Sequence, residues 1–490
     1  MDKPLDQKGN PYSRTLLVLF LLIGTFCTVL NQTLLATAYP KLMDVFNIDT
    51  STVQWLTSGF LMVNGILIPV TAWLSSRFNT KWLYISAMVI FEVGTVMCFA
   101  APNFATLLSG RLIQAVGVGI SMPMLQTIML SIFPPEKRGT AMGLSGVVIG
   151  LAPAIGPTVS GWIIVNAQWR DIFGMIIPIV AIVIIGSLWA MKPILPTSKT
   201  KLDFPSLLLS TIGFGSALYA FSSVGDKGWG SSLVISTLLI GILFVVLFVV
   251  REFKTANPLV NLNVFRSKQF TVGSIIGSLA MMSLIGFEMI LPLYLQIVRG
   301  YNAFHSGLTL LAGAMMIGVL SPFTGRIFDK YGARYLGISG FLLLTIGTIP
   351  FFFLTTDMPI MYVVIIYAIR SCGIAMSMMT ITTYSMNALQ INMMNHGTAA
   401  NNTLRQIASS IATAVMTSVL TNVTNNAKPA HHLLTVDPLQ YKSKMLDAVL
   451  SGYHAAFLVA FIFGLIGLGF TFMLKKGKSV PESSVEGGRK

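Results

Sequence analysis

The residues best placed to do chemistry are ionisable side chains inside apolar segments long enough to span a membrane. Five stand there: Glu92, Arg111, Glu288, Arg370 and Arg405. A charged side chain at the centre of a membrane helix costs about 2.5 to 3.5 kcal/mol on insertion scales, so such residues mark functional or paired positions. A carboxyl group there can bind and release a proton, whereas arginine stays charged and positions charge. The pattern indicates proton or ion movement across a membrane.

Glu288 is the leading candidate for the proton-binding group, because it is the only acid in the apolar segment from 269 to 297. Burial favours its protonated form and a nearby arginine favours its carboxylate, so a change of surroundings can move a proton. A permanent ion pair is the alternative. Glu92 is a second proton-coupling candidate or a structural contact between helices. Arg111 is expected to tune a carboxylate or to bind backbone carbonyls, and Arg405 to extend toward the cytoplasmic surface.

Hydrolytic and metal chemistry find no support. The sequence has no Walker-type phosphate loop and no closely spaced pair of acids that would suit magnesium. Two adjacent histidines, His431 and His432, stand in an external segment where solvation is expected. We therefore expect no enzyme activity, no metal and no cofactor, with the proton gradient as the energy source.

The composition excludes a water-soluble fold. Of the 490 residues, 54% are hydrophobic and 10% are charged, and the mean hydropathy is +0.76. A soluble domain needs about a quarter of its residues charged to cover its surface. The net charge of +15 could suggest a nucleic-acid partner, but basic residues that flank membrane spans produce the same excess. We expect lipid contact and no nucleic acid.

Fourteen apolar runs approach the twenty or so residues that a membrane helix needs. They cover 15–38, 51–75, 82–101, 104–130, 140–165, 171–191, 204–224, 231–250, 269–297, 306–324, 334–355, 358–385, 397–420 and 453–474. The first run ends in Ala36-Thr37-Ala38, which resembles a signal-peptidase site, but it is long for a signal core and contains Asn31-Gln32-Thr33. The outer segment from 421 to 452 reads as a polar loop.

The distribution of basic residues sets the orientation. An even number of spans puts both termini on one side, and if that side is cytoplasmic, cytoplasmic segments hold about three times as many Lys and Arg as external ones. We predict an all-α, multi-pass protein of a bacterial plasma membrane with cytoplasmic termini.

Three landmarks repeat in the same order about 250 to 260 residues apart. The loop from Gly325 to Arg334 repeats a weaker copy from Ala72 to Lys81. Arg370 corresponds in the same way to Arg111, and Gly397-Thr398-Ala399 to Gly139-Thr140-Ala141. Such a repeat predicts two homologous six-helix bundles. The predicted domains are therefore 1–191, an insert of two helices in 192–268, a second bundle in 269–475 and a disordered cytoplasmic tail in 476–490, a 6+2+6 arrangement.

These motifs resemble those of the major facilitator superfamily, and within it the fourteen-helix drug:proton antiporters of the EmrB/QacA type. The loop from Gly325 to Arg334 is similar to the superfamily's signature loop, and Gly156-Pro157 to the antiporter motif of the fifth helix. The segment from Leu30 to Pro40 resembles the first-helix motif of the fourteen-helix group. Two departures stand out, because Asn31 replaces the usual aspartate and Ser76 replaces the acid of the first signature loop.

The resemblance implies roles for further residues. A conformational latch at the cytoplasmic ends is expected from Arg77, Arg326, Asp329 and Arg334. A close helix contact that seals a central cavity is expected from Gly150, Pro153, Gly156, Pro157 and Gly161, because small residues let helix backbones approach. Polar or aromatic residues on the predicted cavity helices, or in apolar spans where polar atoms need a partner, are the substrate-binding candidates: Asn31, Gln32, Trp55, Asn64, Gln114, Phe287, Tyr294, Gln296 and Arg370.

We predict a proton-coupled secondary transporter that exports amphipathic drug-like compounds by alternating access, with small molecules, protons and lipid as partners and a monomeric state. A dedicated exporter of one lipid or metabolite is the alternative, and a membrane sensor or scaffold is a third class. The sequence leaves the substrate, its charge and the role of the two inserted helices open.

Overall fold

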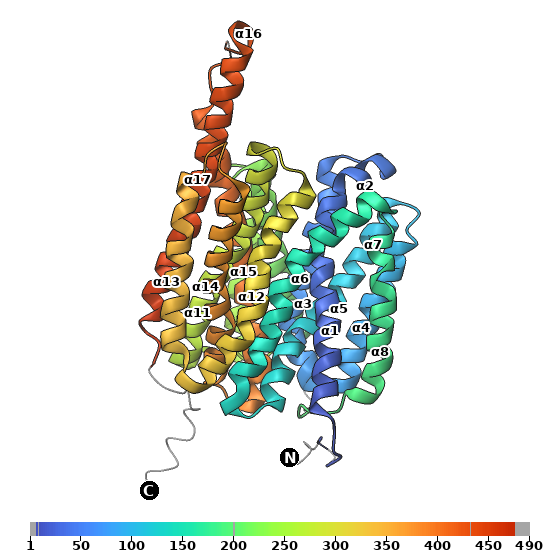
Figure 1. Cartoon of the computed structure of the whole chain (residues 1–490). Coiled ribbons are helices and arrows are strands. Elements are labelled where there is room, and N and C mark those ends of the chain that lie inside the picture. The colour runs from blue at the N-terminus through green and yellow to red at the C-terminus, as the bar shows by residue number, and fades with distance from the viewer. Residues whose placement is uncertain (1–5, 8, 199–200, 432, 476–490) are drawn as a thin grey trace.

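The structure is a computed structural model that describes residues 6–7, 9–198, 201–431 and 433–475. The predicted tail 476–490 and His432 lie outside the described residues. Fourteen helices in this part are long and apolar enough to cross a membrane. They confirm the predicted all-α class and the number of spans. Figure 1 shows the beginning of the first span and the end of the last span on the same side of the molecule, the side that the basic residues assign to the cytoplasm.

The first bundle holds six spans. They are α1 (Arg14–Thr33), α3 (Thr50–Arg77), α4 (Thr80–Phe99), α5 (Phe104–Ile132), α6 (Arg138–Asn166) and the pair α7 (Asp171–Gly174) and α8 (Ile176–Ala190), with the short α2 (Tyr39–Phe46) outside the membrane. Polar caps fix where several of them begin. The side chains of Asp49 and Asn103 accept hydrogen bonds from the backbone of Thr52 and Thr106 and so start α3 and α5.

The insert is a hairpin of α9 (Phe204–Lys227) and α10 (Ser232–Lys254). The second bundle consists of α11 (Lys268–Leu293, continued by a π turn over Tyr294–Val298), α12 (Ala303–Tyr331), α13 (Ala333–Thr348), α14 (Ile360–Met386), α15 (Met394–Ala427) and α17 (Pro438–Thr471). The short α16 (Leu433–Val436) joins the last two. The chain order of elements is thus six spans, two spans and six spans, although the exact domain boundaries stay predictions.

The prediction of a polar external loop from 421 to 452 is wrong. Helix α15 continues to Ala427 and α17 begins at Pro438, so most of the segment is helical and projects beyond the other helices (Figure 1). Proline at the first turn suits a helix start, and the Asp437 side chain caps it by accepting from the Gln440 backbone. Residues 421 to 427 contain neither glycine nor proline, so nothing stops α15 earlier.

The two bundles meet along α6 and α12, which run antiparallel and pack along their whole length. Gly139 approaches Gly325 near the cytoplasmic ends, Gly150 approaches Ile317 in the middle, and Gly161 lies near Phe304 at the outer ends. These glycines make the close approach possible, because a side chain at Gly150 would overlap Ile317.

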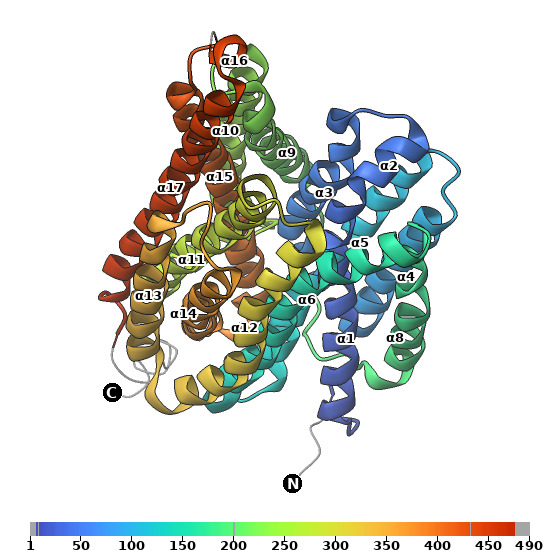
Figure 2. The ribbon, with the colours of Figure 1, turned by 45° about the horizontal axis from the view of Figure 1, so that its top comes forward.

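On the opposite side of the molecule, α3 and α15 pack directly against each other, and the inserted α9 packs against both of them (Figure 2). Tyr219 of α9 stacks on Trp55 of α3, Ser222 donates to Ser58 of α3, and Gly225 faces Thr417 of α15. Helix α10 packs on α9 and leaves most of its surface outward. The hairpin therefore covers the contact between the two bundles on this side.

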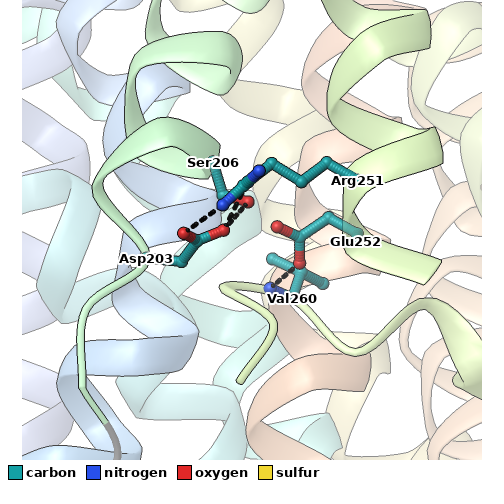
Figure 3. Close-up of polar contacts among 5 residues, drawn as sticks. All are labelled: Asp203, Ser206, Arg251, Glu252 and Val260. Atoms are coloured by element: carbon teal, nitrogen blue, oxygen red, sulfur yellow. Dashed lines mark hydrogen bonds and ion pairs between the residues drawn. The ribbon is translucent and has the colours of Figure 1, made fainter. Parts of the chain in front are cut away.

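The cytoplasmic base of this hairpin is held by a polar cluster (Figure 3). Arg251 of α10 donates twice to the carboxylate of Asp203, at 2.7 and 2.8 Å, and Ser206 donates to the same carboxylate. The hydrogen bonds from Arg251 lower the pKa of Asp203. Neighbouring Glu252 accepts from the backbone of Val260 at 2.8 Å, which ties the following linker to the hairpin.

Candidate functional site

A narrow cavity of about 80 Å³ lies between the two bundles, midway along the helices. Its wall is mainly apolar and includes four methionines, Met122, Met281, Met378 and Met379. Flexible methionine side chains adapt to apolar ligands of different shape. The polar members of the wall are Gln32 of α1, Ser321 of α12 and Glu288 of α11, and Glu288 is its only charged residue in the described part of the chain.

Glu288 is positioned by the outer half of α11. Its neighbour in space is Arg370 of α14, which interacts with it electrostatically without forming a direct ion pair among the described residues. A carboxyl group in an apolar wall, close to one fixed positive charge, can exist either as the acid or as the carboxylate. The cavity thus contains one group able to carry a proton.

Arg370 is fixed by its own bundle rather than exposed to the cavity. It donates to the backbone oxygen and the hydroxyl of Ser283 at 2.6 and 2.8 Å, and to the Thr348 hydroxyl at 3.1 Å. Its guanidinium lies 3.9 Å from the centre of the Phe287 ring. These contacts suit a cation that is held in place to act on Glu288.

Arg111 occupies a related place inside the first bundle. It donates to the backbone oxygens of Leu56 and Asn31 and, at 2.9 Å, to the side-chain oxygen of Gln114, and it lies 4.3 Å from the Phe60 ring centre. No carboxylate pairs with it among the described residues. The geometry matches the expected binding of backbone carbonyls.

The signature loop closes the cytoplasmic ends of the two bundles. The Asp329 carboxylate accepts hydrogen bonds from the backbone of Gly139 and Thr140, at 2.7 and 2.9 Å, and from the Thr140 hydroxyl at 2.5 Å. Its partner is therefore the first turn of α6, where the helix dipole favours negative charge. Arg77 and Arg326 are exposed, and Arg334 donates to the backbone of Leu474 at 3.5 Å.

Three more hydrogen bonds join the bundles near the cytoplasmic side. Arg138 donates to Asn387 at 3.1 Å. Asn395 donates to Ser76 at 3.4 Å. A third bond links α15 to α5, where Asn402 donates to Gln126 at 3.0 Å. Together with the Asp329 contact, these bonds define a state in which the cytoplasmic side is closed.

The predicted glycines and prolines of α6 do not all face α12, because one of them contacts α1. Gly150 and Pro153 lie at the cavity, and Gly161 lies at the outer contact with α12. Gly156 instead faces Thr33 of α1 inside the first bundle. Pro157 stands within α6 without ending it.

Among the substrate-binding candidates, Gln32 lines the cavity. The other candidates of the first bundle do not line this cavity. The Asn31 side chain is buried and has no hydrogen-bond partner among the described residues. Asn64 packs against Gly119 of α5, and Gln114 donates to Thr95. Trp55 faces an outer polar pocket beside α9. Their predicted contact with substrate remains a prediction.

The candidates of the second bundle are also spread out. Phe287 is buried under Arg370 among Phe351, Tyr367 and Phe457. The Tyr294 hydroxyl donates to the backbone of Thr355 at 2.7 Å, and Gln296 is exposed near the outer end of its helix. Polar type and helix number alone do not tell which face of a helix meets the cavity.

Glu92 lies on α4, away from the cavity. One of its carboxylate oxygens is buried without a hydrogen-bond partner among the described residues, and Cys27 of α1 is near enough to interact with it electrostatically. The distance from the cavity leaves Glu288 as the better-placed proton carrier.

Sequence reasoning missed Gln126 and Asn402 and misplaced Arg405. Gln126 and Asn402 meet across the two bundles, and Arg405 is 4% exposed, so its expected extension to the surface is wrong. A signal existed in Asn401-Asn402 and Arg405, which share one helix face at a spacing of three to four residues.

The model of the Major Facilitator Superfamily matches residues 21–413, and the chain belongs to this family. It is 45% identical over 476 residues to the MFS-type transporter YcnB of Bacillus subtilis, covering 97% of this chain and 98% of that protein. It is 37% identical to the lincomycin resistance protein LmrB of the same organism, covering 94% and 96% of the two chains. These relatives confirm the expected family and its likeness to a bacterial drug-resistance protein, and they identify a transporter in a bacterial membrane.

The fold also matches solved transporters. The human organic anion transporter MFSD10 superposes with a TM-score of 0.65 at 13% identity, covering 93% of this chain and 99% of the other. At this identity the likeness defines the fold alone.

Proposed function

We propose that this protein is a proton-coupled antiporter that exports amphipathic, drug-like compounds by alternating access. The observation that carries the proposal is the position of Glu288, a single carboxyl group in the wall of a methionine-rich cavity between the bundles. Similarity to a lincomycin resistance protein supports an exported, drug-like substrate. No cofactor enters the proposal, because the proton gradient supplies the energy.

Transport then follows from competition for one cavity. A proton that enters from outside neutralises Glu288. A substrate that enters from the cytoplasm then displaces this proton. Closure at Asp329 and opening at the outer side release the substrate outward. Arg370 lies near enough to interact with Glu288 electrostatically, and a monomer provides every part of this cycle.

The experiment is a transport screen in proteoliposomes with an imposed pH gradient. Fluorescent amphipathic compounds are offered on the cytoplasmic face, and substrate and proton fluxes are recorded together. An antiporter for many compounds moves protons with several of them, whereas a dedicated exporter responds to one chemical type. Absence of substrate-dependent proton flux with every compound would refute proton-coupled export.

A further inference from the structure

Arg405 lies directly beneath the cytoplasmic end of the central cavity. Its guanidinium donates to the Thr382 hydroxyl at 2.5 Å and to the backbone oxygen of Met378 at 3.5 Å, both on α14. It also faces Gly277 of α11, where an added Cβ would lie 2.9 Å from it. Met378 and Met281, one turn above Gly277, both line the cavity. Arg405 therefore underlies the cavity floor.

This positive charge has no counter-charge. In the described part of the chain the one ion pair is that of Arg251 with Asp203, and the Nε of Arg405 is buried without a hydrogen-bond partner. A buried charge that lacks an ionic partner is costly unless something else compensates it. The guanidinium of Arg405 therefore lacks an anionic partner among the described residues in this state.

Two neighbours of Arg405 are also unsatisfied. The amide nitrogen of Gln126 and the side-chain oxygen of Asn401 are buried and have no hydrogen-bond partner in the part of the chain that the structure describes, and each residue is 1% exposed. Asn401 and Asn402 lie one turn before Arg405 on the same face of α15. We call Gln126, Asn401, Asn402 and Arg405 the inner polar cluster.

The inner polar cluster must open when the cytoplasmic side opens. Gln126 belongs to the first bundle and Asn402 to the second, so their 3.0 Å hydrogen bond breaks when the cytoplasmic ends separate. The polar groups then face the cytoplasmic entrance, where substrate arrives in the proposed export cycle.

We propose that the inner polar cluster binds the carboxylate of the substrate, and that zwitterionic amphipathic compounds are therefore a preferred substrate class. Arg405 recognises the carboxylate, as guanidinium groups do, while Glu288 attracts the cationic centre. Gly277 and Glu288 stand about 16 Å apart along α11 at 1.5 Å per residue, so one elongated molecule can reach from one group to the other. The inference rests on the proposed export function and deepens it.

A matched pair of probes tests the inference. Rhodamine B carries a cationic ring system and a free carboxylate, and rhodamine B ethyl ester has the same cation with the carboxylate blocked. Transport of both is measured in phosphatidylcholine–phosphatidylglycerol proteoliposomes for the wild type, Arg405→Gln and Arg405→Lys. Loss of a charged hydrogen bond predicts that Arg405→Gln raises KM for rhodamine B about tenfold or more, with the KM for the ester unchanged and Arg405→Lys intermediate.

Equal losses for both probes in Arg405→Gln would assign Arg405 a structural role and overturn the inference, and so would unchanged values for both. Export of the ester but not of rhodamine B by the wild type would overturn it while leaving the proposed function intact. Transport of neither probe by the wild type would also overturn the inference, whereas the proposed function would be decided by the wider compound screen.

A second variant covers the case in which Arg405→Gln does not fold. Gln126→Glu keeps the size of the side chain and its acceptor for Asn402, but adds a negative charge to the inner polar cluster. It should raise the KM for rhodamine B and leave that for the ester unchanged. An equal effect on both probes would contradict carboxylate binding.

Discussion

At the scale of single residues, the role of the signature loop comes down to one carboxylate. Asp329 accepts three hydrogen bonds from the first turn of α6, whereas no arginine in the described part of the chain forms an ion pair with it. The resemblance indicated a latch that includes Asp329. The loop spacing could not identify the partner of Asp329, because that partner is the backbone of α6 in the other bundle.

We predict that Asp329→Asn weakens this closure by about 1.5 kcal/mol, the contribution of a charged hydrogen bond, and shifts the population toward the cytoplasm-open state about tenfold. Spin labels at the exposed positions 77 and 330, introduced as Arg77→Cys and Lys330→Cys, should report a longer distance between the cytoplasmic ends. Expression should not change. An unaltered distance distribution together with wild-type transport kinetics would exclude the latch.

Asn31 and Glu288 illustrate what residue type can predict. A neutral residue at the usual first-helix acid left Glu288 as the main candidate, and the structure places Glu288 in the cavity wall. Asn31 is fully buried and is not part of the cavity wall. Which face of a helix meets the cavity depends on packing between helices, which a single sequence does not contain.

At the scale of elements, the contact between α6 and α12 should be disrupted by an added side chain at its cytoplasmic end and should tolerate one at its outer end. An added Cβ at Gly325 would overlap the backbone oxygen of Gly139, whereas one at Gly161 would find its nearest atom, in Phe304, at 3.9 Å. Gly325→Ala should therefore open the cytoplasmic side and slow transport, with Gly161→Ala as the matched control. Equal distances between labels at 77 and 330 in the two variants would contradict this reading.

The base of the inserted hairpin provides a pH prediction. Arg251 lowers the pKa of Asp203, so the Asp203–Arg251 contact stabilises the hairpin above the ordinary pKa of an aspartate and is lost as the pH falls through the lowered value. The protection of backbone amides in residues 201–206 and 251–260 against hydrogen exchange, corrected for the intrinsic pH dependence of the exchange, should fall at acid pH. Asp203→Asn should show the faster exchange at neutral pH already, and a wild-type exchange pattern in this variant would show that the pair does not hold the base.

The spans themselves were predictable because hydropathy and length determine them, whereas the helical extensions of α15 and α17 were not. Their polar residues resemble a loop in composition, and only the caps and the absence of breakers reveal a helix. The packing of α9 against both α3 and α15 likewise depends on contacts that hydropathy does not encode.

At the scale of the whole molecule, the structure is a two-bundle transporter closed on its cytoplasmic side, with one carboxyl group in its central cavity. If one proton enters for each neutral substrate exported, each cycle moves one charge inward, and the membrane potential contributes about 2.3 kcal/mol per 100 mV. Export of a monovalent cation would be electroneutral and driven by the pH difference alone. The central claim is that Glu288 performs this coupling.

The most direct test compares Glu288→Gln with Glu92→Gln in proteoliposomes, measuring substrate accumulation driven by a pH gradient and, separately, downhill substrate exchange. We expect Glu288→Gln to lose accumulation and substrate-linked proton flux while keeping exchange, because the cavity remains but cannot carry the proton. Glu92→Gln should have a mild effect on both. Full accumulation against a gradient by Glu288→Gln, with unchanged proton flux, would contradict the claim and make Glu92 the leading coupling residue.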